Sequence, residues 1–475
     1  MRTGHCHANV VYLCISGATL ELACVWICLI SPDLTAGYNP EFTRQVLEHL
    51  GVSSFQVGRG DLDQMLVRLE RGLIAMGLAY VAGLFVLVRE SWDGTLAKRI
   101  VIGFSVVFQL TFLALPGMYS TDIFSYVMYG RIAGIYGQNP YIAPPSSFAT
   151  DSFLSWVFPF WQNTPTVYGP LWTDVSALLS SATANASALD QVLAYKLLIW
   201  TSAVLNIGLV WTLTQRAEWI RAQRLACFAL YAWNPIVLFE LAGNAHNDAL
   251  MVTLLLLSVV PLTARRLHDR HWLTAVITVT ASALIKFATA PVAVFYVASG
   301  LRRWRAALLA AAAVLALITV VSWPYRASAP TINTRLVINS ISELGVPIEA
   351  ARIIYLGVFA WDLVRVWRLR TPAAALEASA RALLLLPLLV LTWVWTWYFT
   401  WSIALAAVLG IRTRLAQTIV AISAVAPPVF YAHQYLNQDM PTWPLLVYVI
   451  VPAARALPWW GRVYRIVTAR HWLGV

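Results

Sequence analysis

Charged side chains are scarce in this chain. Asp, Glu, Lys and Arg together make up 12% of the 475 residues, whereas soluble proteins carry about 25%. Hydrophobic residues make up 59%, and the mean hydropathy is +0.67. This composition excludes a soluble globular protein and indicates an integral membrane protein with many spans. The apolar runs are long and do not alternate with polar residues, so they predict membrane-spanning helices.

Cysteine is also scarce, with five residues in the whole chain. Four of them lie within apolar runs, and no histidine or carboxylate pattern beside them completes a metal site. We therefore interpret these four as small hydrophobic residues of the interior. They are Cys14, Cys24, Cys28 and Cys227.

Acidic residues are outnumbered by basic ones, 22 to 33, which gives a net charge of +11. Such an excess can indicate a nucleic-acid partner, but here Arg and Lys gather in short loops between apolar runs. Positive loops of membrane proteins stay in the cytoplasm, so we expect no nucleic-acid partner. The predicted cytoplasmic segments are 89–99, 214–224, 264–271, 301–305, 365–370, 411–414 and the tail from Arg455. By alternation, the outward segments are 31–72, 118–190, 242–248, 322–350 and 432–440.

The apolar runs predict an all-α fold with about 11–14 transmembrane helices. The segment 271–300 differs from the others because Arg-rich loops flank both of its ends. A single span would place these loops on opposite sides, against the charge rule. We therefore predict a re-entrant pair of half-helices with Lys286 near its apex. The other predicted spans are 9–30, 73–88, 100–117, 191–213, 225–241, 249–262, 305–321, 353–366 and three or four more between 382 and 453.

One carboxylate, Asp122, lies just past the apolar run 100–117, among aromatic residues. If a helix follows, Asp122, Tyr126 and Tyr129 fall on one face of it. A lone carboxylate among aromatics at a membrane surface indicates a site for a sugar or a cation. The alternative is an ordinary helix cap, because Ser120-Thr121-Asp122 also suits an N-cap.

A second polar group lies at the outer end of a predicted helical hairpin and contains Glu240, His246 and Asp248. A charge at mid-bilayer costs about 2.5–3.5 kcal/mol, so such groups tend to face a cavity. His246 and Asp248 are two residues apart, which suits a shared loop better than one helix face. They could bind a divalent ion or sugar hydroxyls. The alternative is a turn whose Asn and Asp side chains cap the next helix.

Lys286 stands within an apolar stretch and needs a partner for its charge. A phosphate is one candidate, since an ammonium group binds phosphate well as a point charge. A nearby carboxylate is the other. An aromatic run follows at an outer helix end, and either sugar stacking or an interfacial belt explains it. The run consists of Trp393, Trp395, Trp397, Tyr398 and Trp401.

Taken together, several stretches of the chain resemble the GT-C glycosyltransferases, and among them the polyprenyl-phosphate-mannose-dependent α-mannosyltransferases of bacterial envelope assembly. No single stretch is diagnostic, and it is the set, spread from residue 100 onward, that carries the resemblance. The stretches are STDIFSYVMYGR (120–131), GQNPY (137–141), TVYGPLW (166–172), WNPIVLFELAGNAHNDAL (233–250), the segment around Lys286 and WYFTW (397–401).

The resemblance implies a single multi-pass domain in the cell membrane, formed by residues 1–475. Its GT-C-like core would be 100–475, with an outward catalytic loop at 118–190. In the family this loop usually follows the first span, whereas here two additional spans precede the span 100–117 that leads into it. Residues 1–99 are therefore expected to form an additional N-terminal helical hairpin.

The resemblance also implies that Asp122, as the carboxylate of the outward loop, is the general base of sugar transfer. The resemblance favours mannose as the sugar, which would pass from a polyprenyl-phosphate donor to a glycan or glycolipid acceptor with inversion. Lys286 or Arg326 would stabilise the departing phosphate. No cofactor is identified, and a divalent cation stays an open alternative. The candidate substrate-binding residues are Tyr126, Tyr129, Arg131, Tyr141, Tyr168, His246, Asp248, Lys286 and Arg326.

A polytopic transporter or lipid-linked sugar flippase is the rival interpretation, because it too would have many spans, a re-entrant pair and buried charges. Two features speak against it. The chain shows no internal repeat, and the long aromatic outer loop with Asp122 is more than a gate requires.

Overall fold

The structure is a computed structural model that describes residues 2–35, 40–51, 62–90, 94–300, 304–326, 348–391 and 394–436. Within these ranges every regular element is a helix, so the predicted all-α fold is confirmed for the described part of the chain. The predictions for Trp393, the tail from Arg455, residues 327–347 and residues 437–440 concern parts of the chain that the structure does not describe.

Six helices in the described ranges are long and apolar enough to cross a membrane, and there are seven if a helix pair bent by 51° counts as one span. This confirms a polytopic membrane protein. Three further apolar helices are shorter, and because residues 437–475 are not described, the total of about 11–14 spans stays a prediction. The six are Asn9–Thr35, Gln64–Arg89, Thr95–Leu113, Ala188–Arg216, Trp304–Tyr325 and Pro372–Leu389.

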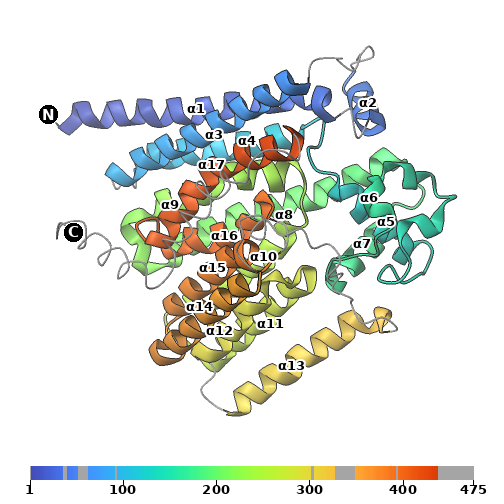
Figure 1. Ribbon diagram of the computed structural model, residues 1–475. Helices are drawn as coiled ribbons and strands as arrows, with labels where there is room; N and C mark the ends of the chain where they lie inside the picture. Colours follow the sequence, from blue (N-terminus) through green and yellow to red (C-terminus); the bar gives the residue numbers. More distant parts are fainter. Residues whose placement is uncertain are drawn as a thin grey trace, which may run out of the picture.

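The N-terminal helices pack as one layer along the rest of the chain (Figure 1). Helix α1 (Arg2–Thr35) lies against α3 (Leu62–Glu90) and α4 (Thr95–Leu113), and α17 (Arg414–Leu436) also packs on α3. The predicted hairpin is thus formed by α1 and α3, with the short helix α2 (Pro40–His49) in the segment between them. Its separation from the core as an addition stays a prediction.

The predicted outward loop contains short helices rather than a span. Helix α5 (Asp122–Gly134) packs against α7 (Pro170–Ala182), and Figure 1 shows both beside α6 (Pro159–Gln162), at one end of the long helices. Two 3₁₀ turns, η1 (Pro145–Phe148) and η2 (Ser152–Trp156), complete the loop before α8 (Ala188–Arg216) begins. Helix α7 starts at a Gly-Pro step, where proline is compatible with the first helical turn.

The predicted re-entrant segment does turn back on itself. Helix α11 (Asp269–Ile285) ends at Lys286, which has an extended backbone, and α12 (Ala290–Gly300) returns alongside α11. Gly300, at the end of α12, lies so close to Trp272, near the start of α11, that a Cβ atom there would overlap the indole ring. Both ends of the segment therefore lie together, with Lys286 at the turn.

Helix α13 (Trp304–Ser322) lies at the edge of the molecule and exposes most of its surface (Figure 1). The exposed side chains include Leu308, Leu309, Leu315 and Val320. An apolar surface of this size is typical of a lipid-facing helix, because soluble proteins rarely expose contiguous apolar patches larger than a few hundred Å².

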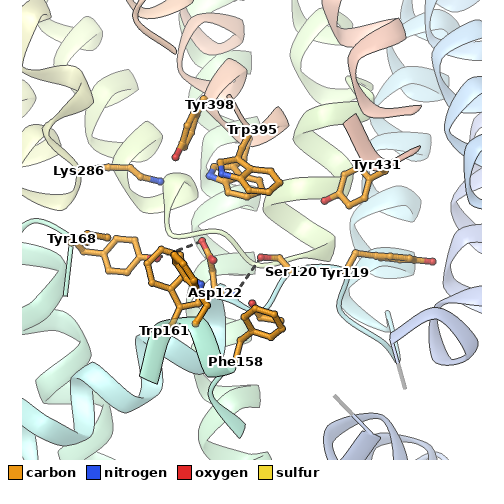
Figure 2. A pocket seen from close by; sticks show the side chains of 14 residues that line it. Tyr119, Ser120, Asp122, Phe158, Trp161, Tyr168, Lys286, Trp395, Tyr398 and Tyr431 are labelled. Atoms are coloured by element: carbon orange, nitrogen blue, oxygen red, sulfur yellow. Dashed lines mark hydrogen bonds between the residues drawn. The ribbon is translucent and has the colours of Figure 1, made fainter. Parts of the chain in front are cut away.

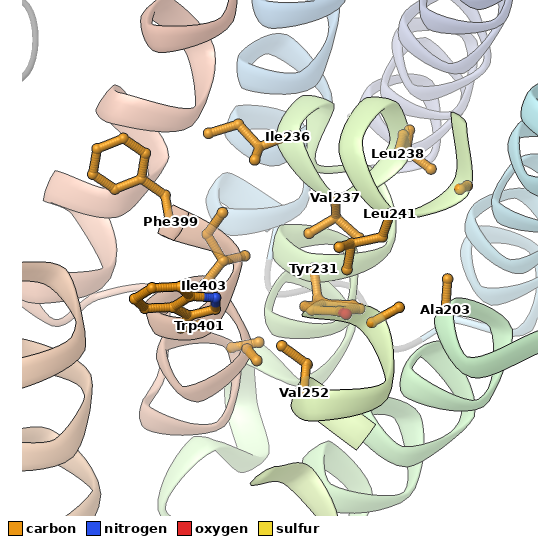
Figure 3. Packing of buried hydrophobic residues seen from close by; sticks show 14 of the residues in the cluster. Ala203, Tyr231, Ile236, Val237, Leu238, Leu241, Val252, Phe399, Trp401 and Ile403 are labelled. Carbon is orange, nitrogen blue, oxygen red and sulfur yellow. The ribbon is translucent and has the colours of Figure 1, made fainter. Parts of the chain in front are cut away.

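The centre of the molecule is a tightly packed apolar cluster to which several segments contribute (Figure 3). Tyr231 of α9 (Arg224–Ala232), Leu241 of η4 (Val237–Gly243), Val252 of α10 (Asp248–Val259) and Trp401 of α16 (Thr400–Leu409) are all buried in it. The element η4 is a π-helix, a wider turn that often occurs at functional sites. This cluster fixes the position of the polar turn that follows η4.

The four cysteines that the sequence predicts to be interior are buried or partly buried. Cys24 and Cys227 are buried, and Cys14 and Cys28 are partly buried.

Candidate active site

A cavity of about 490 Å³ opens where the outward loop meets the turn after α11 and the segment before α16 (Figure 2). Its walls are mostly aromatic, and it holds one carboxylate and one ammonium group, those of Asp122 and Lys286. The lining residues are Tyr119, Ser120, Thr121, Asp122, Phe158, Phe160, Trp161, Val167, Tyr168, Lys286, Trp395, Trp397, Tyr398 and Tyr431.

Asp122 is the first residue of α5, and its side chain does not cap that helix. The N-cap position belongs to Thr121, where no side-chain cap bond forms. The Asp122 carboxylate instead accepts hydrogen bonds from the hydroxyls of Tyr126 and Tyr168, each at 3.4 Å. Its side chain is 15% exposed, on the cavity wall. The capping alternative is therefore wrong for Asp122, and the predicted pairing of Asp122 with Tyr126 on one helix face is confirmed.

The third neighbour of Asp122 is His246, whose Nδ1 lies 3.5 Å from Asp122 Oδ2. On the other side, His246 Nε2 lies 3.4 Å from Glu240 Oε2. Burial alone would lower the pKa of His246, but its contacts with these two carboxylates raise the pKa to about 9. The imidazole is therefore cationic at neutral pH.

The contact with His246 also affects the charge of Asp122. Burial alone would raise the pKa of Asp122, but the contact with His246, the charge of Lys286 and the Tyr126 hydroxyl hold this pKa below its ordinary value. Asp122 is thus a carboxylate at neutral pH, able to accept a hydrogen bond or a proton from a ligand in the cavity.

Glu240 is fully buried and surrounded by donors from distant parts of the chain. Asn244 Nδ2 donates to it at 3.0 Å and the Tyr431 hydroxyl at 3.2 Å, while Thr396 Oγ1 donates to the other oxygen. Sequence reasoning identified Glu240 but not Tyr431 or Thr396, because nothing in the local pattern brings 240, 396 and 431 together.

The sequence left two partners open for Lys286, a phosphate and a nearby carboxylate. In the structure, Lys286 pairs with a carboxylate. Its Nζ lies 2.8 Å from Asp248 Oδ2, and Trp401 Nε1 donates to the other Asp248 oxygen at 2.5 Å. The ammonium also lies 5.3 Å from the centre of the Tyr398 ring. The Lys286 side chain is nevertheless 18% exposed and lines the cavity. Since an ammonium has three donors, Lys286 can bind an anion there while it stays paired with Asp248.

Three predicted tyrosines, Tyr126, Tyr129 and Tyr168, lie near Asp122 and are buried. The rings of Tyr126 and Tyr168 meet edge to face, 4.9 Å apart. Tyr129 is 2% exposed and donates its hydroxyl to the Thr164 carbonyl oxygen at 2.8 Å. Tyr168 lines the cavity, whereas Tyr126 and Tyr129 support it from behind.

Three other predicted residues do not line this cavity. Arg131 forms a two-pronged ion pair with Asp151, at 2.9 and 3.0 Å, which holds the outward loop against α5. Tyr141 donates to the Tyr168 carbonyl oxygen at 2.8 Å. Arg326 is exposed and donates to the carbonyl oxygen of Trp323 at 3.1 Å. The first two position the loop, and Arg326 lies directly before residues that the structure does not describe.

The aromatic wall on the outward loop was missed from the sequence. Phe158, Phe160 and Val167 are 41%, 46% and 40% exposed and line the cavity together with Trp161. The sequence does contain a pattern that indicates this wall, because large apolar residues cluster at 158–167 in a segment too short to cross a membrane. Across the cavity, Trp395 and Trp397 stack in parallel, with ring centres 5.0 Å apart, so at least part of the late aromatic run belongs to the site.

The described residues contain no group of three or more His, Cys, Asp or Glu side chains arranged to hold a metal ion. Around Asp122 the reason is geometric, because His246 lies between Asp122 and Glu240 and turns one nitrogen toward each. These three side chains therefore do not converge on a common point, and they do not fit a protein-held cation.

Comparison with known proteins matches residues 22–302 to the family model described as alpha-(1->6)-mannopyranosyltransferase, N-terminal domain. Alpha-(1->6)-mannopyranosyltransferase A of Mycobacterium tuberculosis is 27% identical over 461 residues, which cover 88% of this chain and 84% of the relative. A second alpha-(1->6)-mannopyranosyltransferase of that organism is 30% identical over 155 residues, 32% of this chain and 25% of the relative. Alpha-(1->6)-mannopyranosyltransferase B of Corynebacterium glutamicum is 28% identical over 144 residues, 30% of this chain and 23% of the relative.

The chain thus spans about a quarter of the length of two of these relatives and most of the third. No solved structure matches it. The family model covers more than half of the chain and includes Asp122, His246 and Lys286. The resemblance found in the sequence motifs is therefore confirmed, and the protein belongs to the alpha-(1->6)-mannopyranosyltransferase family.

Proposed function

We propose that this protein transfers mannose from a polyprenyl-phosphate donor to a hydroxyl of a glycan or glycolipid acceptor at the outer face of the cell membrane. The observation that carries the proposal is the placement of Asp122, a partly exposed carboxylate in an aromatic cavity that Lys286 also lines. The relatives' names, all alpha-(1->6)-mannopyranosyltransferases, support mannose as the sugar and an α-linked product.

In this reaction Asp122 acts as the general base. It takes the proton of the acceptor hydroxyl while the acceptor oxygen attacks the anomeric carbon. The bond between that oxygen and the anomeric carbon forms as the bond from the carbon to the phosphate oxygen breaks, and the electron pair leaves with the phosphate. A single displacement of this kind inverts the anomeric centre, so a β-linked donor gives an α-linked product.

One carboxylate is enough for this chemistry. A glycosidase needs a second carboxyl group to protonate a poor leaving group, whereas a lipid phosphate leaves as a stable anion. What the leaving group needs is charge stabilisation. Lys286 is suited to this role because its ammonium reaches the same cavity as Asp122 (Figure 2). Lys286 is the better of the two predicted candidates, because Arg326 does not line the cavity.

The aromatic walls suit a sugar substrate. The apolar faces of pyranose rings pack on aromatic side chains, and Trp395 and Trp161 lie on different sides of Asp122 in Figure 2. The exposed Phe158 and Phe160 give the outer rim an apolar character that also suits an isoprenoid chain.

The proposal is tested with purified protein in lipid nanodiscs, a polyprenyl-phosphate mannose donor and a synthetic α-mannoside acceptor. We expect the acceptor to gain one mannose, detected by mass spectrometry, with an α-linkage by NMR. GDP-mannose, which lacks the lipid phosphate, should not serve as donor. Absence of transfer, combined with movement of the lipid-linked sugar across a liposome membrane, would instead establish the rival interpretation, a flippase.

A further inference from the structure

His246 lies between two carboxylates that come from different elements. Its two ring nitrogens lie 3.5 Å from Asp122, at the start of α5, and 3.4 Å from Glu240, in η4. The His246 side chain is fully buried and does not line the cavity. It therefore acts on the cavity through the residues it contacts there, of which Asp122 carries the charge.

The position of His246 is fixed from three sides. Its ring stacks on Trp397 with centres 3.9 Å apart, and its backbone N–H donates to the Glu240 carbonyl oxygen at 3.2 Å. The preceding residue, Ala245, has a φ of 55°, in the left-handed region that residues with a Cβ rarely occupy. Such strained backbone persists only where the surroundings determine it, and it occurs preferentially at functional sites.

Glu240 is fixed equally well. Asn244, Thr396 and Tyr431 all donate hydrogen bonds to its carboxylate, which is fully buried. Donors from three segments hold this carboxylate in one orientation. Glu240 thus presents a fixed carboxylate to the imidazole, on the side away from Asp122.

We propose that Glu240 and His246 form a positioning pair that keeps Asp122 ionised and aimed into the cavity. Without a cation between them, two buried carboxylates would repel each other, and one would take up a proton. With the imidazolium between them, Asp122 remains a carboxylate although it is largely buried. Because His246 already carries its proton, it does not relay the proton of the acceptor, which leaves Asp122 through the cavity.

Other groups around the pair do not replace His246. From α5 and the outward loop, Tyr126 and Tyr168 offer neutral hydroxyls to Asp122. From α17, Tyr431 offers a hydroxyl to Glu240. Among the described residues, Lys286 is a further cation that acts on Asp122, but it forms its own ion pair with Asp248 at 2.8 Å. His246 is therefore the cation that both carboxylates share.

The kinetic test rests on the proposed function and uses the pH dependence of kcat for His246→Gln. Loss of the imidazolium should move the acidic limb of the profile, which reports protonation of Asp122, to higher pH by about one unit or more. In Glu240→Gln the histidine loses its proton more readily, so the alkaline limb should move to lower pH. A merely structural role would lower kcat at every pH without moving either limb.

His49→Gln is the matched control, because His49 is exposed on α2, away from the cavity. It should leave the profile unchanged. Unmoved limbs in both His246→Gln and Glu240→Gln, in samples that unfold at the wild-type temperature, would overturn the proposal.

A second test does not depend on mannose transfer. In protein labelled with ¹⁵N-histidine, the His246 signal is identified by its loss in His246→Gln. We expect it to have the shifts of an imidazolium at neutral pH and to titrate at about 9, and to titrate at lower pH in Asp122→Asn. A neutral His246 at neutral pH overturns the pairing even if the protein transfers mannose. An imidazolium in a protein that transfers no mannose refutes the proposed function but leaves the pairing intact.

Discussion

The backbone N–H of Tyr119 donates a hydrogen bond to Asn244 Oδ1 at 3.0 Å. This bond joins the segment that leads into Asp122 to the turn that carries His246. Asn244 also donates to Glu240, so one amide side chain contacts both sides of the site. Proximity of Asp122 and His246 is therefore maintained by the backbone as well as by their charges.

The segment before Asp122 is held from the N-terminal layer too. Ser31 Oγ in α1 accepts a hydrogen bond from the Gly117 N–H at 3.0 Å, and the Tyr119 hydroxyl donates to the Ile27 carbonyl oxygen at 2.8 Å. From α8, Lys196 Nζ donates to the carbonyl oxygen of Leu115 at 3.1 Å. Helix α1 thus has a physical role in the site.

Gly117→Ala tests this role of α1. A Cβ atom at residue 117 would overlap Thr35 Oγ1 and lie 2.8 Å from the Ser31 carbonyl oxygen. Relief of this overlap must shift the loop, so we expect a lower kcat and a destabilisation of about 1–3 kcal/mol, measured by thermal unfolding. Gly103→Ala in α4 is the control, because nothing lies within 4 Å of a Cβ there, and it should be neutral or slightly stabilising. Equal behaviour of the two variants would exclude a tight fit between α1 and the loop.

Asp122→Asn tests the general base. Asparagine keeps the size and most hydrogen bonds of aspartate but cannot take the acceptor proton, so turnover should fall by about a hundredfold or more. Donor binding should stay close to that of the wild type, and the variant should fold, with an unfolding temperature lowered by the loss of the charged contact with His246. Asparagine caps helices about as well as aspartate, so a capping role would predict almost no loss. Near wild-type transfer by the folded variant would refute the base assignment, and Asp248 would become the next candidate.

Much of this site was predictable from local sequence. Asp122 was identified from its place after an apolar run, and its pairing with Tyr126 follows from helix periodicity. The turn at Lys286 was predicted from the charges at both ends of 271–300, a pattern that reports topology directly. In each case the necessary information lies within a few residues or in the charges of the flanking loops.

The relationships among distant segments were not predictable in this way. Glu240, His246 and Asp122 form one row because η4 widens and Ala245 takes a left-handed backbone, and neither feature has a signature in the sequence. His246 was expected to contact substrate, whereas its side chain is buried behind Asp122. The partner of Lys286 was left open between phosphate and carboxylate, since only three-dimensional packing brings Asp248 within 2.8 Å.

The role of Lys286 in donor binding is tested in the Asp248→Asn variant, in which residue 248 carries no charge. Lys286→Met alone would leave the buried Asp248 carboxylate unpaired, which typically costs about 3–5 kcal/mol in stability. The double variant Lys286→Met with Asp248→Asn removes both charges and should fold. Relative to Asp248→Asn alone, it should bind the lipid-phosphate donor about tenfold or more weakly, as loss of a charge-assisted hydrogen bond implies.

Acceptor binding should change little in that double variant. Arg326→Met is the control with the same chemical change, because Arg326 does not line the cavity, and its donor affinity should match that of the wild type. Unchanged donor affinity in the double variant would exclude a phosphate contact by Lys286. If only Arg326→Met weakens donor binding, then Arg326 and not Lys286 contacts the donor phosphate.

The orientation of the chain is tested by labelling single cysteines in a cysteine-free background. His268 and Ala149 are both exposed. Cysteines at 268, 93 and 303 should react only with reagents on the cytoplasmic side, because all three positions lie in Arg-rich loops. A cysteine at 149 should react from outside. Labelling of 268 and 303 from opposite faces would contradict the returning pair formed by α11 and α12.

The charge on His246 predicts how stability depends on pH. Its pKa is raised in the folded protein from 6.5, the ordinary value, to about 9. A group whose pKa is raised by folding stabilises fully below its unfolded value and loses that contribution as the pH rises through the folded value. The unfolding temperature in detergent should therefore fall between about pH 6.5 and 9, because the imidazolium that separates Asp122 from Glu240 is lost.

Asp122 acts in the opposite direction. Its pKa is lowered from 3.8, so its contribution to stability is present above that value and is lost only in strong acid. Between about pH 6.5 and 9 the His246 imidazolium is lost, so His246→Gln should remove this contribution and reduce the slope of the unfolding temperature against pH. His49→Gln should keep the wild-type slope. A wild-type protein equally stable throughout this range would show that the two carboxylates do not depend on a histidine cation.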